Sequence, residues 1–297
     1  MTSQAIPYIL LQGVIFGTSM LASRFSIGQY HPLTFVGARL SLAGLGHLAV
    51  YLLSRRRFPR DAELLKRSVL IGIFGTAIPM SFIVTSMQYQ SSGITAVLIT
   101  VAPAITVLMA HFVLPDESLN RRKALGIMLA LSGAVSLILL GESGLPDVSQ
   151  VNPIGYGLVF GAMIFGGGTT VYARKYMREM DSFDVSTVRM VTAALIVMPI
   201  SLLVAGFDFS SVDSRGYFAL IYGTLTGTFA GALIGFIVIK RFGATVSSMV
   251  AYIIPVVAGI GGVLLLGEQI TIGMLGGVAL IMLGLALINR RGPQVVV

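Results

Sequence analysis

Ten continuous apolar segments, each about twenty residues long, constrain the fold of this chain more than any other feature. A helix of about 20 residues crosses a hydrocarbon core about 30 Å thick, whereas the strands of a membrane β-barrel alternate apolar with polar residues. Of the residues, 55% are hydrophobic and only 11% are charged, too few charges to cover the surface of a soluble domain of this length. We therefore expect an all-α polytopic membrane protein with ten transmembrane helices, near residues 7–23, 33–54, 68–88, 94–114, 124–140, 153–173, 185–205, 216–239, 245–266 and 272–288.

The distribution of basic residues predicts the orientation of these helices. Sixteen of the twenty Lys and Arg residues lie in loops on the side of the N-terminus, and only Arg24 and Arg215 lie in loops on the other side. Because Lys and Arg accumulate in cytoplasmic loops, both termini are expected in the cytoplasm, with the helices in a bacterial inner membrane. The asymmetry also accounts for the net charge of +8, so no nucleic-acid partner is needed.

The polar residues argue against an enzyme. The chain has no cysteine, and its twelve acidic residues all lie in loops or at helix ends, so no cofactor, metal site or catalytic residue is expected. Gly-x-Ser-x-Gly elbows, His-Glu-x-x-His and Walker-type loops are missing from the sequence. Residues 1–7 lack the basic stretch of a signal peptide, so we expect the first apolar segment to persist as a helix.

An internal repeat with an offset of 148–152 residues runs along the chain. It pairs Phe16-Gly17 with Phe165-Gly166, Arg39 with Arg189, Gly75-Thr76 with Gly223-Thr224, Pro103 with Pro255, Glu117 with Glu268, Gly126 with Gly277 and Gly133 with Gly284. Each half, residues 1–145 and residues 146–297, holds five spans, an odd number, so the second half is predicted to insert upside down relative to the first. Inverted repeats recur in secondary transporters, which bind substrate near the midplane where the halves meet.

The repeated residues also carry a family resemblance. Each half has Phe-Gly in its first span, Arg early in the second, Pro inside the fourth and an acidic residue 13–14 positions later. The chain resembles the drug/metabolite transporter superfamily, and within it the ten-helix EamA-type exporters, over nearly its whole length. Phe16 departs from that pattern, because many members carry tryptophan there.

The resemblance implies export of small metabolites, with amino acids, including aromatic ones, prominent among the substrates. The expected partners are thus a small-molecule substrate and the lipid bilayer. Export of drugs, nucleobases or nucleosides stays open within the superfamily, and a channel or an intramembrane enzyme stays open outside it. No acidic residue is predicted at the midplane, which favours neutral, zwitterionic or anionic cargo over organic cations.

Arg39 and Arg189 are the only charged residues well inside the predicted spans. A charge there must face protein or a water-filled cavity. Each guanidinium could be a gate or could hold a substrate carboxylate, but the matched duplication favours a structural role in both halves. Pro103 and Pro255 each remove a backbone hydrogen bond inside a span, and a matched pair favours a hinge or a substrate site over incidental kinks.

Polar side chains at helical spacing are candidates to line the substrate cavity. Residues at i, i+4 and i+7 share one face of a helix, although most Ser and Thr in membrane helices bond to their own helix or to a neighbour. The candidates for substrate contact are Gln12, Phe16, Ser19, Ser81, Thr85, Gln88, Thr100, Tyr156, Tyr222, Thr226, Ser248 and Tyr252.

Glycines and end-of-helix acids are interpreted as scaffold. Glycine recurs at every fourth position of the eighth span, and small residues form seams in the fifth and tenth spans. Such seams let helices approach closely, inside the chain or across a homodimer contact. Glu117 and Glu268 are predicted to be helix caps or interface anchors, and the coupling ion is left open.

Overall fold

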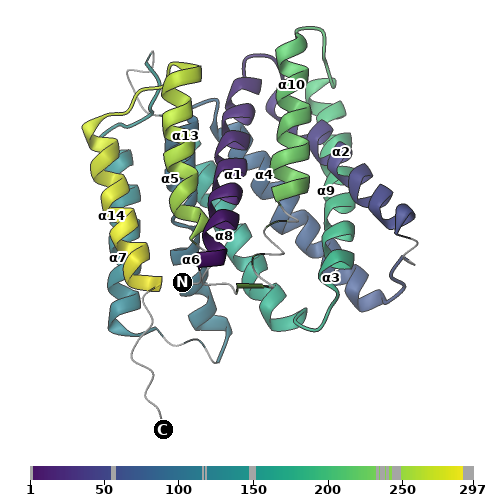
Figure 1. The fold of residues 1–297 in the computed structure, drawn as a ribbon, viewed down its shortest axis with the longest axis horizontal. Coiled ribbons are helices and arrows are strands. Elements are labelled where there is room, and N and C mark those ends of the chain that lie inside the picture. The colour runs from purple at the N-terminus through teal and green to yellow at the C-terminus, as the bar shows by residue number, and fades with distance from the viewer. Residues whose placement is uncertain are drawn as a thin grey trace.

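The computed structural model describes residues 3–54, 58–115, 117, 119–146, 152–231, 234, 238, 241–242 and 249–289. The regular elements in these ranges are helices (Figure 1). In chain order they are η1 (Ser3–Ala5), α1 (Ile6–Ser26), α2 (Pro32–Leu53), α3 (Ala62–Gly72), η2 (Ile73–Ala77), α4 (Ile78–Ser86), α5 (Ser92–Ile99), α6 (Ala102–Val113), α7 (Arg121–Leu139), α8 (Pro153–Tyr176), α9 (Ser182–Ala205), α10 (Ser214–Tyr222), η3 (Gly223–Ala230), α13 (Val250–Leu266) and α14 (Ile272–Asn289).

The predicted all-α membrane fold is confirmed. Eight helical stretches in the described ranges are long and apolar enough to cross a membrane, among them the continuous Ala62–Ser86, formed by α3, η2 and α4, and Ser92–Val113, formed by α5 and α6. Two further predicted spans are also helical. The shorter apolar helix α13 corresponds to the ninth predicted span, and α10 with η3 forms the beginning of the eighth predicted span. The predicted segments therefore correspond to these ten helical stretches.

Short polar residues, three of them acidic, cap several helix starts. An unpaired N–H of a first helical turn is satisfied by a side-chain oxygen of the capping residue. The residues whose oxygens accept such a bond are Asp61, Ser91, Asn120, Asn152, Asp181 and Asp213, and the Nδ1 of His31 accepts one at the start of α2.

Helix pairing follows an inverted symmetry. Helix α1 packs against α13 as α8 packs against α6, and α1 packs against α10 and η3 as α8 packs against α4 and η2. The pairs α2–α9 and α7–α14 join equivalent helices of the two halves, and they lie toward opposite edges of the molecule in Figure 1. Helix α1 begins and α14 ends toward the same lower face. We call this face, where the described loops carry most of the Lys and Arg, the basic side, and the other face the opposite side.

The third span of each half contains a π-helical segment at equivalent positions. Segment η2 holds Gly75-Thr76 and η3 holds Gly223-Thr224, which are matched in the repeat. Each segment packs against the helix that carries the buried arginine of the other half, η2 against α9 and η3 against α2. π-Helical turns occur frequently at functional sites.

The glycine seams of the fifth and tenth spans pack against each other. A Cβ atom added to Gly126 would lie 2.6 Å from the carbonyl oxygen of Gly284, and one added to Gly133 would lie 2.7 Å from that of Gly277. The backbones of α7 and α14 are therefore in direct contact, and the seam belongs to the interior of the chain.

Candidate substrate cavity

A cavity of about 530 Å³ lies between the two halves and is lined by α1, α2, η2, α4, α5, α9, η3 and α13. We call it the central cavity. Arg39 follows the start of α2 on the opposite side by seven residues, and Arg189 follows the start of α9 on the basic side by seven residues. Seven helical residues rise about 10 Å, so the two arginines bracket the middle of a membrane about 30 Å thick.

A second cavity, of about 470 Å³, continues the central cavity toward the basic side. It shares Arg189 and the wall formed by Gly75, Pro79 and Ile83 with the central cavity. It also reaches Ala173 in the last turn of α8 and Val185 in the first turn of α9. We call it the basic-side cavity, and the two together give a route from that face to the midplane.

Arg39 lines the central cavity and joins three of the elements around it by hydrogen bonds. Its Nε donates to Thr228 Oγ1 at 2.7 Å, and its two Nη atoms donate to Ser23 Oγ at 2.8 Å and Ser19 Oγ at 2.6 Å. The guanidinium thus ties α2 to α1 and η3. Glycine is required at position 227, because a Cβ there would lie 2.0 Å from Ser19 Oγ and 2.7 Å from Arg39 Nη2.

Arg189 occupies the equivalent position of the second half but has different surroundings. It lines both cavities, and its buried Nε has no hydrogen-bond partner. At the repeat offset of 149 residues, Gly168 and Tyr172 stand where Ser19 and Ser23 stand in the first half. Thr76 Oγ1, in the wall of the same central cavity, is also buried without a partner. Among the described residues that line the two cavities there is no Asp or Glu.

Four of the sequence candidates meet at the central cavity. Phe16 and Ser19 line it from α1, and Arg39 and Arg189 line it from α2 and α9. Gln12, one turn before Phe16, is buried and donates a long bond of 3.5 Å to the carbonyl of Gly231, while its Oε1 has no partner.

The candidates of α4 do not line the central cavity. Ser81 and Thr85 are half-buried, and Gln88 is exposed beyond the end of the helix. Helix α4 instead turns Met80 and Ile83 to the cavity. One residue along a helix rotates the side chain by about 100°, so a polar stripe predicted from spacing alone faces another neighbour.

Four further candidates make hydrogen bonds outside the two cavities. The hydroxyls of Thr100 and Thr226 donate to the carbonyls of Val97 and Tyr222 in their own segments. Tyr222 donates to Thr18 Oγ1 at 2.8 Å, and Tyr156 donates to the carbonyl of Glu142. These bonds are the scaffold alternative that membrane helices favour for small polar groups. Ser248 lies outside the described residues.

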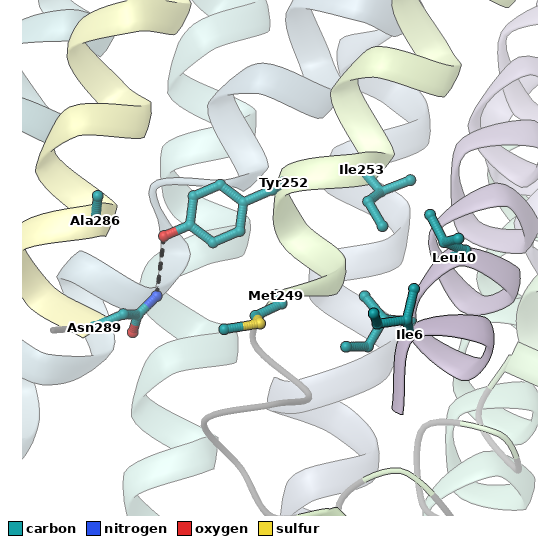
Figure 2. A pocket seen from close by; sticks show the side chains of 8 residues that line it. Ile6, Leu10, Met249, Tyr252, Ile253, Ala286 and Asn289 are labelled. Carbon is teal, nitrogen blue, oxygen red and sulfur yellow. Dashed lines mark hydrogen bonds between the residues drawn. The ribbon is translucent and has the colours of Figure 1, made fainter. Parts of the chain in front are cut away.

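Tyr252 lines a separate, apolar pocket between α1, α13 and α14 (Figure 2). Its hydroxyl accepts a hydrogen bond of 3.1 Å from Asn289 Nδ2. Ile6, Leu10, Met249 and other side chains of this pocket do not line the central cavity. The structure therefore does not bring Tyr252 together with Arg39 and Arg189.

The two matched prolines have different local structures. Pro103 lies in the first turn of α6, directly after the break at Thr100-Val101 that separates α5 from α6. Because proline has no amide hydrogen, the carbonyl of Ile99 loses its usual helical donor, and Ile99 lines both cavities. Pro255 lies inside the uninterrupted helix α13. Pro103 is thus beside the cavity wall, whereas Pro255 lines a smaller apolar pocket between α13 and α14.

Several residues of the site were missed by spacing arguments. The hydroxyls of Ser23 and Thr228 accept bonds from Arg39, and the unpartnered hydroxyl of Thr76 lines the central cavity with Arg189. Helical spacing alone selected none of these three residues. The internal repeat could have indicated them. Its matched pairs Gly75-Thr76 and Gly223-Thr224 lie in the π-helical segments that pack against the helices of Arg189 and Arg39.

The matched acidic residues tie helices together at the two faces, as predicted for caps and anchors. Glu268 accepts bonds from Ser92 N at 2.7 Å and Ser92 Oγ at 2.8 Å at the start of α5, and lies 3.7 Å from Arg24 Nε. Glu117 pairs with Arg174 and, at 3.3 Å, with Lys123. Partial burial acts to raise the pKa of Glu117, but the hydrogen bonds and charges of Arg174 and Lys123 outweigh it and lower that pKa below its usual value.

Two inverted five-helix halves around a cavity at mid-depth are the architecture of a multi-pass membrane transporter. The comparison with known proteins agrees. The chain belongs to the EamA-like transporter family, whose sequence profile matches residues 3–139 and again residues 153–290.

The relatives are transporters of nearly the same length. The uncharacterized transporter YoaV of Bacillus subtilis is 26% identical over 92% of this chain and 92% of its own. A probable amino-acid metabolite efflux pump of Salmonella typhimurium is 23% identical, covering 93% and 91%, and an S-adenosylmethionine/S-adenosylhomocysteine transporter of Chlamydia muridarum is 24% identical, covering 97% and 92%. A crystal structure with 18% identity gives a TM-score of 0.65 over 97% of this chain and 96% of its own, which shows the same fold.

Proposed function

We propose that the protein exports small metabolites, amino acids foremost, across the bacterial inner membrane by alternating access. The observation that carries this proposal is the central cavity, which is lined by both halves, holds the hydrogen-bonded Arg39 and is continued by the basic-side cavity past Arg189. If the basic side is cytoplasmic, as the distribution of Lys and Arg predicts, this conformation takes up solute from the cytoplasm.

The inverted repeat supplies the second conformation. When each half adopts the arrangement of the other, the route past Arg189 closes and the route past Arg39 opens. The bonds from Arg39 to Ser19, Ser23 and Thr228 must then break, and water entering from the opposite side would replace these partners. The two states differ little in energy because similar contacts are exchanged between similar halves.

The chemistry of the cavity supports amino acids as cargo. The cavity offers a guanidinium, the hydroxyl of Thr76 and the Ile99 position, whose carbonyl has lost its helical donor, within largely apolar walls. A zwitterion with a small side chain needs a donor, an acceptor and apolar surface. The printed name of the Salmonella relative, an amino-acid metabolite efflux pump, agrees with this class, and the Chlamydia relative is named for larger amino-acid derivatives, one of which is a sulfonium cation. Without an acidic lining residue in the described ranges, organic cations are disfavoured.

Transport in proteoliposomes tests the proposal. Purified protein would be assayed with a panel of labelled amino acids, nucleobases and nucleosides, with and without a pH gradient. We expect saturable flux of at least one amino acid, inhibited by its unlabelled form. Saturable flux of nucleobases alone would favour the other class of exporter, and flux linear in concentration would indicate a channel.

A matched pair of variants links such flux to the cavity. Gly166 lines the basic-side cavity, and nothing lies within 4 Å of a Cβ added there. Gly166→Phe should therefore fill the route without disturbing the packing, and reduce flux at least about tenfold. Gly276→Phe places the same side chain in equally open space on α14, away from both cavities, and should retain flux. Equal flux in both variants would remove the basic-side cavity from the route.

A further inference from the structure

We infer that Arg189 and Thr76 form an anion subsite, and that the exported solute carries one carboxylate group that binds there. This inference rests on the proposed export function and specifies its substrate class. It assigns the two arginines different tasks, since Arg39 is a tie between helices and Arg189 is a substrate-binding residue.

The comparison of the two halves separates the arginines. Arg39 donates hydrogen bonds to three neighbouring hydroxyls, those of Ser19, Ser23 and Thr228, at 2.6–2.8 Å. Gly166 and Gly167 line the basic-side cavity together with Arg189 and offer no side-chain oxygen. At the position equivalent to Ser19, residue 168 is also glycine. The second half therefore keeps the arginine but has glycine and tyrosine at the positions equivalent to the serines that bond to Arg39.

Among the described residues, Arg189 makes no hydrogen bond to the neighbouring elements. Thr169 donates its hydroxyl to the carbonyls of Phe165 and Gly166, and Thr106 donates to that of Ala102. His47 on α2 packs against two phenylalanine rings, with its Nδ1 3.4 Å from Thr187 Oγ1 and its buried Nε2 without a partner, so it does not bond to Arg189 either. A buried guanidinium without an acceptor is costly, so a site that retains one is expected to receive its acceptor from a ligand.

Two orphaned polar groups point to the same ligand. Arg189 Nε and Thr76 Oγ1 are both buried, both unpartnered, and both belong to residues of the central cavity. A carboxylate has two oxygens, which accept a pair of parallel bonds from a guanidinium and leave lone pairs for a hydroxyl donor. Arg189 and Thr76 together match this pattern.

The charge of the cavity favours a monoanion. Arg189 contributes one positive charge, and the other lining cation, Arg39, already donates to three hydroxyls. A phosphate dianion would bring a second negative charge into a low-dielectric site with no second free cation among the described lining residues. Phe16, Met80 and Ile83 provide apolar surface for the rest of the solute.

The test measures binding as well as transport. The thermal unfolding temperature of the detergent-purified full-length protein would be recorded with each amino acid of the flux panel, with the corresponding amino-acid amide and with inorganic phosphate. We expect the transported amino acid to raise the unfolding temperature, and its amide and phosphate not to do so. An amide as effective as the acid, or a stronger effect of phosphate, would overturn the single-carboxylate assignment.

Variants then locate the subsite. R189Q should weaken binding of that amino acid at least about tenfold, R189K should keep part of it because the charge stays but the paired bonds are lost, and T76V should weaken it several-fold. T224V is the matched control, since Thr224 is the repeat equivalent of Thr76 in η3 and donates to the carbonyl of Leu220. If R189Q does not fold, the binding of the amino acid to R189K and T76V tests the subsite instead. Unchanged binding in R189K and T76V, or in R189Q, would overturn the subsite.

The failure of this inference is distinct from the failure of the proposed function. Saturable flux of a neutral solute with no preference for carboxylates, unchanged in R189K and T76V, would leave an exporter without this anion subsite. Loss of all saturable flux from the wild-type protein would contradict the export function itself.

Discussion

Arg39 and Arg189 occupy equivalent positions in the two halves but have different hydrogen-bond surroundings. A guanidinium inside a membrane protein needs acceptors, because the hydrocarbon core offers none. Ser19, Ser23 and Thr228 meet this need for Arg39, and their short bonds hold α1, α2 and η3 together on the opposite side. In the proposed alternating-access cycle, these bonds would have to be exchanged for water when the opposite side opens.

Removing one acceptor of Arg39 should destabilise the closed conformation. Thr228→Val keeps the shape of the side chain but leaves Arg39 Nε without its acceptor, which should cost about 1–3 kcal/mol. The measurement is the unfolding free energy of the purified protein in detergent. Thr226→Val is the control, since the Thr226 hydroxyl bonds only within its own segment, to Tyr222, among the described contacts. A change no larger in Thr228→Val than in Thr226→Val would show that Arg39 does not depend on this contact.

At the scale of helices, the tightest contact between the halves is the α7–α14 seam. A Cβ on Gly284 would lie 2.4 Å from the carbonyl oxygen of Gly126 and 2.6 Å from the backbone N of Ala130. Both partners are backbone atoms, which cannot move without separating the helices. A larger side chain in this seam would therefore force the two helices apart.

Gly284→Ala should open this seam and destabilise the protein by about 1–3 kcal/mol through overpacking. Gly276→Ala, on the same helix with nothing within 4 Å of the added Cβ, should be neutral or stabilising by up to about 1 kcal/mol, because alanine favours the helix. Thermal unfolding of both purified variants checks the pair. Equal unfolding temperatures would mean that the α7–α14 contact relaxes at little cost.

Glu117 joins the ends of α6, α7 and α8 on the basic side, and its lowered pKa gives this tie a pH dependence. A carboxyl whose pKa is lower in the folded state contributes stability above its unfolded-state pKa, about 4.3, and loses it as the pH falls through the folded value. Glu117→Gln should therefore lower the unfolding temperature at neutral pH, and the difference from wild type should shrink as the pH falls below about 4. Glu63→Gln, which removes an exposed pair with Arg67 within α3, should have a smaller effect. A difference that grows on acidification would contradict the role given to Glu117.

For the whole molecule, the sequence was sufficient to predict the architecture. A membrane requires long apolar helices with basic loops on one side, and both patterns persist over the full chain. The repeat also located Arg39 and Arg189, and through them Phe16 and Ser19, at the cavity between the halves. These predictions depend on residue type and on order along the chain.

The rotation of each helix could not be predicted in the same way. The π-helical segment η2 changes the phase between α3 and α4, so Met80 lines the cavity and Ser81 does not. Tyr252 likewise lies between α1 and α14, away from the central cavity. Residue spacing predicts which side chains share one face of a helix, but it does not predict which helix packs against that face. Arg189 has no hydroxyl partner equivalent to Ser19, because residue 168 is glycine. This difference is found only when the sequences of the two halves are aligned with each other.

The direction in which the cavity opens predicts which side can reach it. Because the chain has no cysteine, single-cysteine variants report on one position each without further engineering. Gly166→Cys lines the basic-side cavity in open space and should react with a membrane-impermeant thiol reagent in inside-out vesicles but not in right-side-out ones. Ser26→Cys is the control on the opposite side, where Ser26 is fully buried and donates to the carbonyl of Ser23, and it should react slowly in both preparations. Reaction of Gly166→Cys from the right-side-out preparation alone would reverse the orientation inferred from the basic loops. Faster reaction of Ser26→Cys than of Gly166→Cys would instead place the resting protein in the opposite conformation.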